Sequence, residues 1–172
     1  TERNAALFGP PRRTYVYLNY GIHRCLGLVG HPEGEAGGVL LRAAEVLAGG
    51  DLAVARRGRD TGPKLLSGPG NLGQGLGITL EMGHAPVEIV AAPPEVADDG
   101  GTSARLAAPA APARFLLAPP APRDPAEPPI EVVTGPRVGV SGEGGSVRFP
   151  WRFSVAGHRS VSAFRRGRNV PD

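Results

Sequence analysis

Residues 14–29 read TYVYLNYGIHRCLGLV, and this stretch decides the fold that we expect. From Thr14 to Tyr20, β-branched and aromatic residues alternate with two-residue spacing, which predicts a β-strand. Gly21 breaks the pattern, and residues 22–29 predict a second extended segment. In such a hairpin Tyr15 and Tyr17 share one face, while Tyr20 points to the other face or lies at the tip.

Outside the hairpin the sequence predicts short elements. We expect a buried strand over residues 39–44, a helix over 51–57 with Asp51 as its N-cap, and a short irregular helix over 65–78. Further strands are expected at 113–117 and 151–155, with ordered chain at 130–133 and 136–140. This mixture favours an α+β domain around an antiparallel sheet.

Length and composition limit the class of protein. A chain of 172 residues suffices for one compact domain, and its core must come from Ala, Val and Leu because aromatics make up 5%. The single cysteine, Cys25, excludes a disulfide framework and is compatible with a reducing cytoplasm. The histidines lack metal-ligand spacing, and no apolar run approaches the roughly 20 residues of a membrane span. We therefore expect a soluble intracellular domain without a metal site.

The stretch from Ala91 to Pro129 differs from the rest. It holds 10 of the 19 prolines and many alanines, interrupted by the apolar run at 113–117. This composition predicts a Pro/Ala-rich insertion or loop around a single strand.

Two clusters suggest nucleic-acid binding. The three tyrosines, Tyr15, Tyr17 and Tyr20, fall within six residues, where their rings are placed to stack on a nucleobase or wedge into a duplex. Between Gly144 and Pro171 there are no acids, but arginines alternate with aromatics: Arg148, Arg152, Arg159, Arg165, Arg166 and Arg168 with Phe149, Trp151, Phe153 and Phe164. The plain alternatives are that tyrosines favour strands and that a basic tail is simply solvated. Both interpretations stay open at this level.

The glycine-rich stretch at residues 68–73 is not interpreted as a dinucleotide-binding loop. Residues 68–73 fit G-x-G-x-x-G letter by letter, but Pro69 sits inside the turn and no convincing strand precedes it. A dinucleotide-binding loop needs the strand, and an acid about 20 residues on.

Several blocks together resemble the 3-methyladenine (alkyladenine) DNA glycosylase family. They are TYVYLNYGIHRCL at 14–26, VLLRAAE at 39–45, LSGPGNL at 66–72, PRVGV at 136–140 and WRFSVAG at 151–157. The blocks follow the family's order and cover nearly the whole chain outside the insertion. The resemblance implies one domain over residues 1–172, with a curved antiparallel sheet, flanking helices and a protruding DNA-inserting hairpin.

The resemblance also implies residue roles. Tyr20 matches the wedge that fills the vacated stack, and Tyr17 matches a ring that stacks on the flipped base. Leu40 and Arg42 match the pocket wall and water site, and the Val138 carbonyl matches a ligand of the attacking water. His23 and the turn at Ser67 and Gly68 match DNA contacts, the turn as a helix start whose N–H groups hold a phosphate.

The sequence departs from the family at several positions. Gly27 stands where an asparagine is usual, which should enlarge the base pocket and loosen selectivity. Arg24 replaces a common aromatic, and Glu2 replaces the proline of a T-P-R-N segment. The family's general base is a glutamate in an upstream E-T-E-A-Y-like segment that these 172 residues lack. Because Met82 is the only methionine, we expect an N-terminally incomplete chain.

The function implied is repair of DNA by base excision. The enzyme would flip an alkylated or deaminated purine out of duplex DNA and hydrolyse its N-glycosidic bond without a cofactor. We expect a monomer acting on damaged double-stranded DNA in the cytoplasm, at the nucleoid, and not at a membrane. The alternative is a catalytically inactive module that binds distorted duplexes. Lacking the general base, the chain is expected to show little excision.

Overall fold

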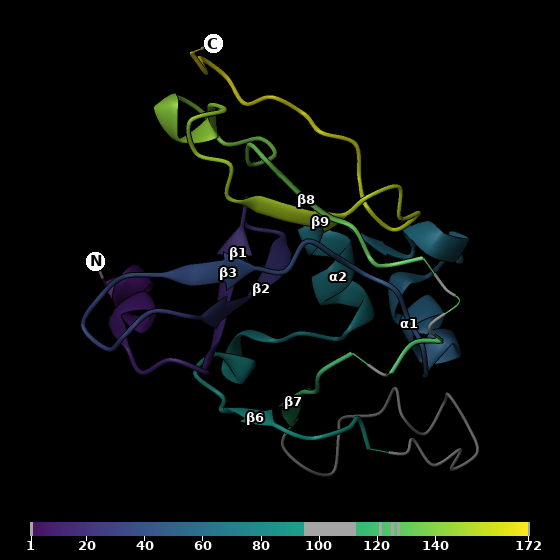
Figure 1. Ribbon diagram of the computed structural model, residues 1–172. Coiled ribbons are helices and arrows are strands. Elements are labelled where there is room, and N and C mark those ends of the chain that lie inside the picture. The colour runs from purple at the N-terminus through teal and green to yellow at the C-terminus, as the bar shows by residue number, and fades with distance from the viewer. Residues whose placement is uncertain (1, 95–112, 121, 125, 127, 172) are drawn as a thin grey trace. The chain divides into compact units, whose positions relative to one another are not determined.

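The computed structural model describes residues 2–94, 113–120, 122–124, 126 and 128–171. The chain forms two compact units, Thr1–Pro122 and Arg123–Asp172, and each is described by itself. Both units mix short helical segments with small sheets (Figure 1). The mixed α and β content agrees with the predicted class, whereas one curved sheet and one domain over the whole length stay predictions.

The predicted hairpin is confirmed and forms the centre of the first unit. Strand β1 (Thr14–Asn19) pairs antiparallel with β2 (His23–Val29), and β2 pairs antiparallel with β3 (Gly38–Leu40). The register runs from Thr14 opposite Leu28 to Asn19 opposite His23. Figure 1 shows the three strands side by side.

The stretch predicted as one buried strand over 39–44 is two strands. β3 ends at Leu40, and β4 (Ala43–Ala44) belongs to a separate antiparallel pair with β5 (Leu66–Ser67). Val39 is mostly exposed, so burial was also overestimated. The chain changes partner here because the Leu41 N–H still donates to the Leu26 carbonyl, while the Arg42 carbonyl accepts from Gly68.

Two α-helices follow, close to where the sequence placed them. Helix α1 (Gly50–Arg57) is capped by Gly49 in the left-handed conformation, so the prediction of Asp51 as N-cap is wrong. Asp51 lies in the first turn, where a carboxylate favours the helix dipole without capping it. Helix α2 (Pro69–Gly75) occupies half of the predicted 65–78 segment, because β5 takes its first part.

Short helical segments complete the first unit. The 3-10 segments are η1 (Glu2–Phe8), η2 (Gly62–Lys64) and η3 (Leu80–Met82). In the part of the chain that the structure describes, no helix has the length and apolar character needed to cross a membrane.

The core of the first unit packs the helices against one face of the sheet. It consists of small and aliphatic side chains, as the composition predicted: Leu26, Ala53, Leu65, Leu66, Leu72 and Ile78. Val16 and Leu41 pack against this cluster from the strands beside Leu26. Since side chains alternate along a strand, Tyr15 and Tyr17 point to the opposite face.

Helix α2 lies directly against the backbone of β2. A Cβ atom on Gly73 would overlap the Arg24 carbonyl oxygen, so this approach requires glycine. The buried Arg57 side chain ties α1 to α2, because its Nε donates to the Leu65 carbonyl (3.1 Å) and its Nη1 donates to Gln74 Oε1.

The first unit ends in a small parallel pair. β6 (Val87–Ile89) pairs with β7 (Phe115–Leu117), which confirms the strand predicted at 113–117 but not an antiparallel arrangement there. Arg114 forms a two-point ion pair with Glu88 beside these strands. Most of the predicted insertion at 91–129 lies outside the described residues.

The second unit is built on an antiparallel pair. β8 (Val132–Gly135) pairs with β9 (Arg152–Val155), in agreement with the strand predicted at 151–155, and η4 (Glu143–Gly145) lies between them in sequence. Residues 136–140 are ordered but form no strand. Cβ atoms on Gly145 and on Gly167 would both overlap the Val140 carbonyl oxygen, so three segments meet at this carbonyl.

The contact between α2 and β2 gives a stability test. Gly73→Ala should lower the free energy of unfolding by about 2 kcal/mol, because α2 must move away from Arg24 to admit the methyl group. Urea denaturation measures this loss. Gly50→Ala is the matched control, since its Cβ meets no atom within 4 Å and its φ is not left-handed. It should stay within about 1 kcal/mol of the wild type, and equal stability of the two variants would contradict the packing described.

Candidate nucleic-acid interface

The tip of the β1–β2 hairpin presents an exposed aromatic ring. Tyr20 and Gly21 both have positive φ, 51° and 71°, and the Ile22 N–H donates to the Asn19 carbonyl to close the turn. The Tyr20 residue is 87% exposed. A bulky residue in the left-handed region is uncommon and costs conformational energy, and such strain gathers at functional sites. The turn therefore presents the aromatic ring of Tyr20 to solvent.

The face of the hairpin opposite the core is aromatic. Tyr15 and Tyr17 stack with ring centroids 5.2 Å apart and planes inclined by 25°. The strand register places Tyr15 opposite Gly27 and Tyr17 opposite Cys25. Both rings are half-buried, so part of each remains accessible.

The third strand adds an apolar and a cationic side chain to this face. Gly27 on β2 pairs with Tyr15 on β1 and with Leu40 on β3, so it lies between these two residues across the sheet. The Leu41–Leu26 backbone bond continues the register past β3, which brings Arg42 beside Cys25. The charge of Arg42 accordingly acts on the pKa values of both Tyr17 and Cys25. The structure therefore gathers Tyr17, Gly27 and Leu40, which the resemblance assigned to the base pocket, together with Arg42, which it assigned to the water site.

The electrostatics of this face keep Tyr17 neutral. Burial and the neighbouring thiol of Cys25, including a hydrogen bond to it, raise the pKa of Tyr17 to about 12. Burial also raises the pKa of the Cys25 thiol, although the bond with Tyr17 and the charge of Arg42 oppose the effect. Tyr17 thus stays an uncharged ring, suited to stacking on a flat aromatic partner.

The start of α2 lies next to this sheet. A Cβ on Gly70 would be 2.7 Å from His23 Nδ1, so the His23 ring lies against the first turn of the helix. The predicted helix start after Gly68 is confirmed, but the Gly68 N–H already donates to the Arg42 carbonyl at 2.8 Å. The Asn71 side chain donates to the Ser67 carbonyl at 2.6 Å. The turn therefore anchors Arg42 to α2.

The remaining predicted residues belong to the second unit. Val138 is half-buried between β8 and η4, and the following Gly139 N–H donates to the Arg165 carbonyl at 2.9 Å. Its role stays a prediction. Across the described residues, no three His, Cys, Asp or Glu side chains gather in a way that would hold a metal ion.

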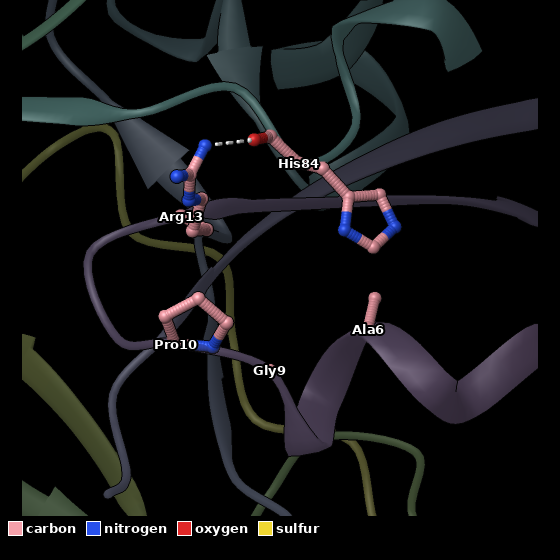
Figure 2. Close-up of a pocket in the computed structure, with 5 residues that line it drawn as sticks. All are labelled: Ala6, Gly9, Pro10, Arg13 and His84. Atoms are coloured by element: carbon pink, nitrogen blue, oxygen red, sulfur yellow. Dashed lines mark hydrogen bonds between the residues drawn. The ribbon is translucent and has the colours of Figure 1, made fainter. Parts of the chain in front are cut away.

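A cavity of about 230 Å³ in the first unit has no counterpart in the sequence-based site. It is lined by Ala6, Gly9, Pro10, Arg13 and His84. In Figure 2 the His84 ring points toward the Ala6 methyl group, and Arg13 Nη1 donates to the His84 carbonyl at 3.0 Å. Residues 71 positions apart form it without a motif, so sequence reasoning had no signal for it. It contains none of the residues assigned to the base pocket.

Comparison with known proteins agrees with the blocks from which the resemblance was drawn. The family model for methylpurine-DNA glycosylase matches residues 1–159. The chain belongs to the methylpurine-DNA glycosylase family. These glycosylases are hydrolases. A protein of Nocardia farcinica named "Putative 3-methyladenine DNA glycosylase" is 42% identical over 172 residues, covering 99% of this chain and 68% of that protein.

Proteins with the same name from two other bacteria are similar over comparable lengths. The one from Corynebacterium efficiens is 41% identical, with 98% of this chain and 71% of the relative covered. The one from Cutibacterium acnes is 39% identical, with 96% and 74% covered. The family similarity therefore extends over both structural units.

The raised pKa of Tyr17 predicts how stability depends on pH. An ordinary tyrosine titrates near 10, so the folded chain holds this proton more tightly than the unfolded chain does. The stabilisation is complete below about pH 10 and is lost as the pH rises through about 12. Tyr17→Phe should therefore lose less stability than the wild type between about pH 9 and pH 11.5 in urea denaturation. Parallel pH profiles for the two proteins would contradict this environment for Tyr17.

Proposed function

We propose that this protein acts in base excision: it recognises alkylated or deaminated purines in double-stranded DNA and hydrolyses their N-glycosidic bond after the base has left the duplex. These 172 residues carry no general-base glutamate motif, so we expect little excision from them alone. The observation that carries the proposal is the exposed, left-handed Tyr20 at the tip of a hairpin whose outer face is aromatic. Family membership supports the reaction type. The protein would act as a monomer on nucleoid DNA in the cytoplasm.

In this proposal Tyr20 supplies the wedge. An apolar or aromatic side chain inserted between base steps offsets part of the few kcal/mol that unstacking costs. The Tyr20–Gly21 turn holds the ring outside the sheet before DNA arrives, so little side-chain and backbone freedom is lost on insertion. A damaged or mispaired base costs less to extrude, which contributes to selectivity.

The face beside the hairpin would receive the extruded base. Tyr17, neutral and stacked on Tyr15, offers a ring surface for a purine. Leu40 would form the wall across Gly27. Gly27 is itself buried, and the extra room expected there rests on the family's usual asparagine at this position. We therefore expect broad tolerance of exocyclic groups on the purine.

The hydrolytic step requires a positioned water. Arg42, tied through its carbonyl to Gly68, and the Val138 carbonyl each match a water ligand of the family, and both roles rest on that resemblance. Proton removal from water needs a general base. The resemblance places that base in a motif which none of these 172 residues carries, so we assign the role to no residue here.

Contacts with the DNA backbone would lie at the start of α2. The His23 ring lies beside the first turn of the helix, next to Ser67 and Gly68. Phosphate contacts of this kind fix the position of a protein on a duplex without reading its sequence.

The wedge is tested by Tyr20→Ala in a duplex that carries one hypoxanthine. Binding, measured by fluorescence anisotropy, should weaken at least about tenfold relative to the wild type, because unstacking is no longer offset. Leu47→Ala is the matched control, since Leu47 is 91% exposed in the same unit and has no assigned role. Equal affinity of both variants would contradict the wedge.

Cleavage is measured on the same duplex by the appearance of abasic sites. Binding that depends on Tyr20 without any abasic product would favour the alternative, a DNA-binding module without catalytic activity. Excision by the chain as printed would show that the missing glutamate motif is not required.

A further inference from the structure

Strand β9 of the second unit and Trp151, the residue directly before it, expose a row of aromatic and aliphatic side chains. Trp151 is 59% exposed and Phe153 is 69% exposed. Residues 151, 153 and 155 alternate with the less exposed Arg152 and Ser154, so the exposed side chains share one face. Val132 extends this face from β8, where it pairs with Val155. We call Trp151, Phe153, Val155 and Val132 the β9 face.

The indole of Trp151 is held in place by its neighbours. The Arg137 guanidinium lies over the ring, 5.1 Å from its centroid, and Nη2 of Arg137 donates to the Gly144 carbonyl at 2.8 Å. Phe149 meets Trp151 edge-on, with centroids 5.0 Å apart and planes inclined by 64°. The ring is therefore fixed before a ligand arrives, although more than half of the residue remains exposed.

The sequence that follows and flanks β9 is rich in arginine, although the exposed Glu131 lies beside the end of β9, where its carbonyl accepts from Ala156 N–H at 2.9 Å. Between Gly144 and Pro171 the sequence has no acidic residue. Exposed arginines precede and follow β9: Arg148, Arg159, Arg165, Arg166 and Arg168. The ion pair of Arg148 with Glu143, at 3.3 Å, is exposed on both sides and is therefore weak.

We propose that the β9 face is a binding surface for single-stranded DNA, formed by residues that have no assigned role in lesion recognition. Exposed rings two residues apart lie about 6.6 Å apart along a strand and present successive stacking positions. The stacking faces of bases are free in a single strand and covered in a duplex, while arginines attract the phosphates of either. Exposed aromatic side chains in an arginine-rich segment therefore match unpaired DNA best. This inference does not rest on the assignment of Tyr20, Tyr17 or Arg42.

Trp151 is the only tryptophan of the chain, so its fluorescence reports directly on the surface. The experiment titrates the protein with oligothymidylate of about 20 nucleotides and with a duplex of the same length. Saturable quenching by the single strand, and much weaker quenching by the duplex, is the expected result. Equal quenching by both, or none by the single strand, overturns the proposal. A shift in Trp151 emission that depends on protein concentration without DNA also overturns it, because a second copy would then cover the face.

Variants separate stacking from charge. Phe153→Ala should weaken oligothymidylate binding about 5- to 150-fold, the range for loss of one stacked base. Phe8→Ala, at a half-exposed aromatic of the first unit, is the matched control and should bind like the wild type. If Phe153→Ala binds like Phe8→Ala, the rings do not stack on bases and the proposal fails.

The double variant Arg165→Gln, Arg168→Gln should lower the slope of log affinity against log salt by about 1.4, since each phosphate contact on a single strand contributes about 0.7. The control is the double variant Arg59→Gln, Lys64→Gln, which removes two exposed cations from the first unit. If both double variants give the same salt slope, the proposed phosphate contacts of Arg165 and Arg168 are wrong.

Tyr20→Ala should retain the quenching of Trp151 fluorescence by oligothymidylate. If the chain does not bind hypoxanthine duplexes but its Trp151 fluorescence is quenched by oligothymidylate, only the proposed function is contradicted. If it binds hypoxanthine duplexes and its fluorescence is not quenched by oligothymidylate, only this inference is contradicted.

Discussion

The register of the β1–β2 hairpin is the constraint on which the first unit depends. Thr14 pairs with Leu28 and Asn19 with His23, which sends Val16 and Leu26 into the core and Tyr15 and Tyr17 to the outer face. A slip of one residue would exchange the two faces. The same register sets where the turn falls, and so places Tyr20 at the tip.

Close backbone contacts transmit this register to the rest of the site. Helix α2 reaches β2 because Gly73 has no side chain to collide with the Arg24 carbonyl, and His23 then lies against the helix start. The bond from the Gly68 N–H to the Arg42 carbonyl holds the segment after β3 to the same helix. The position of Arg42 thus depends on β2 and on the start of α2, two elements that are distant from each other in sequence.

Local patterning predicted the elements that packing leaves undisturbed. Alternation found β1, β2 and β9, and the resemblance assigned to one pocket the residues that the sheet gathers, Tyr17, Gly27 and Leu40. Local patterning did not predict that the strand over 39–44 is interrupted after Leu40. The chain there changes its pairing partner from β2 to β5, and this change depends on the non-local hydrogen bond from Gly68 N–H to the Arg42 carbonyl. The sequence also predicted Asp51 as the N-cap, whereas Gly49 caps the helix, because composition does not show which residue adopts the left-handed conformation. The cavity beside His84 arises from sequence-distant residues without a motif.

We infer that damaged DNA binds at the outer face of the hairpin, with Tyr20 at its tip. Mapping of backbone amide chemical shifts by NMR, during titration with a hypoxanthine-containing duplex, tests it most directly. We expect the largest changes on residues 15–22, Gly27, Leu40 and Arg42, and smaller changes with an undamaged duplex. Changes centred on the cavity around Ala6 and His84, with the hairpin unaffected, would contradict it.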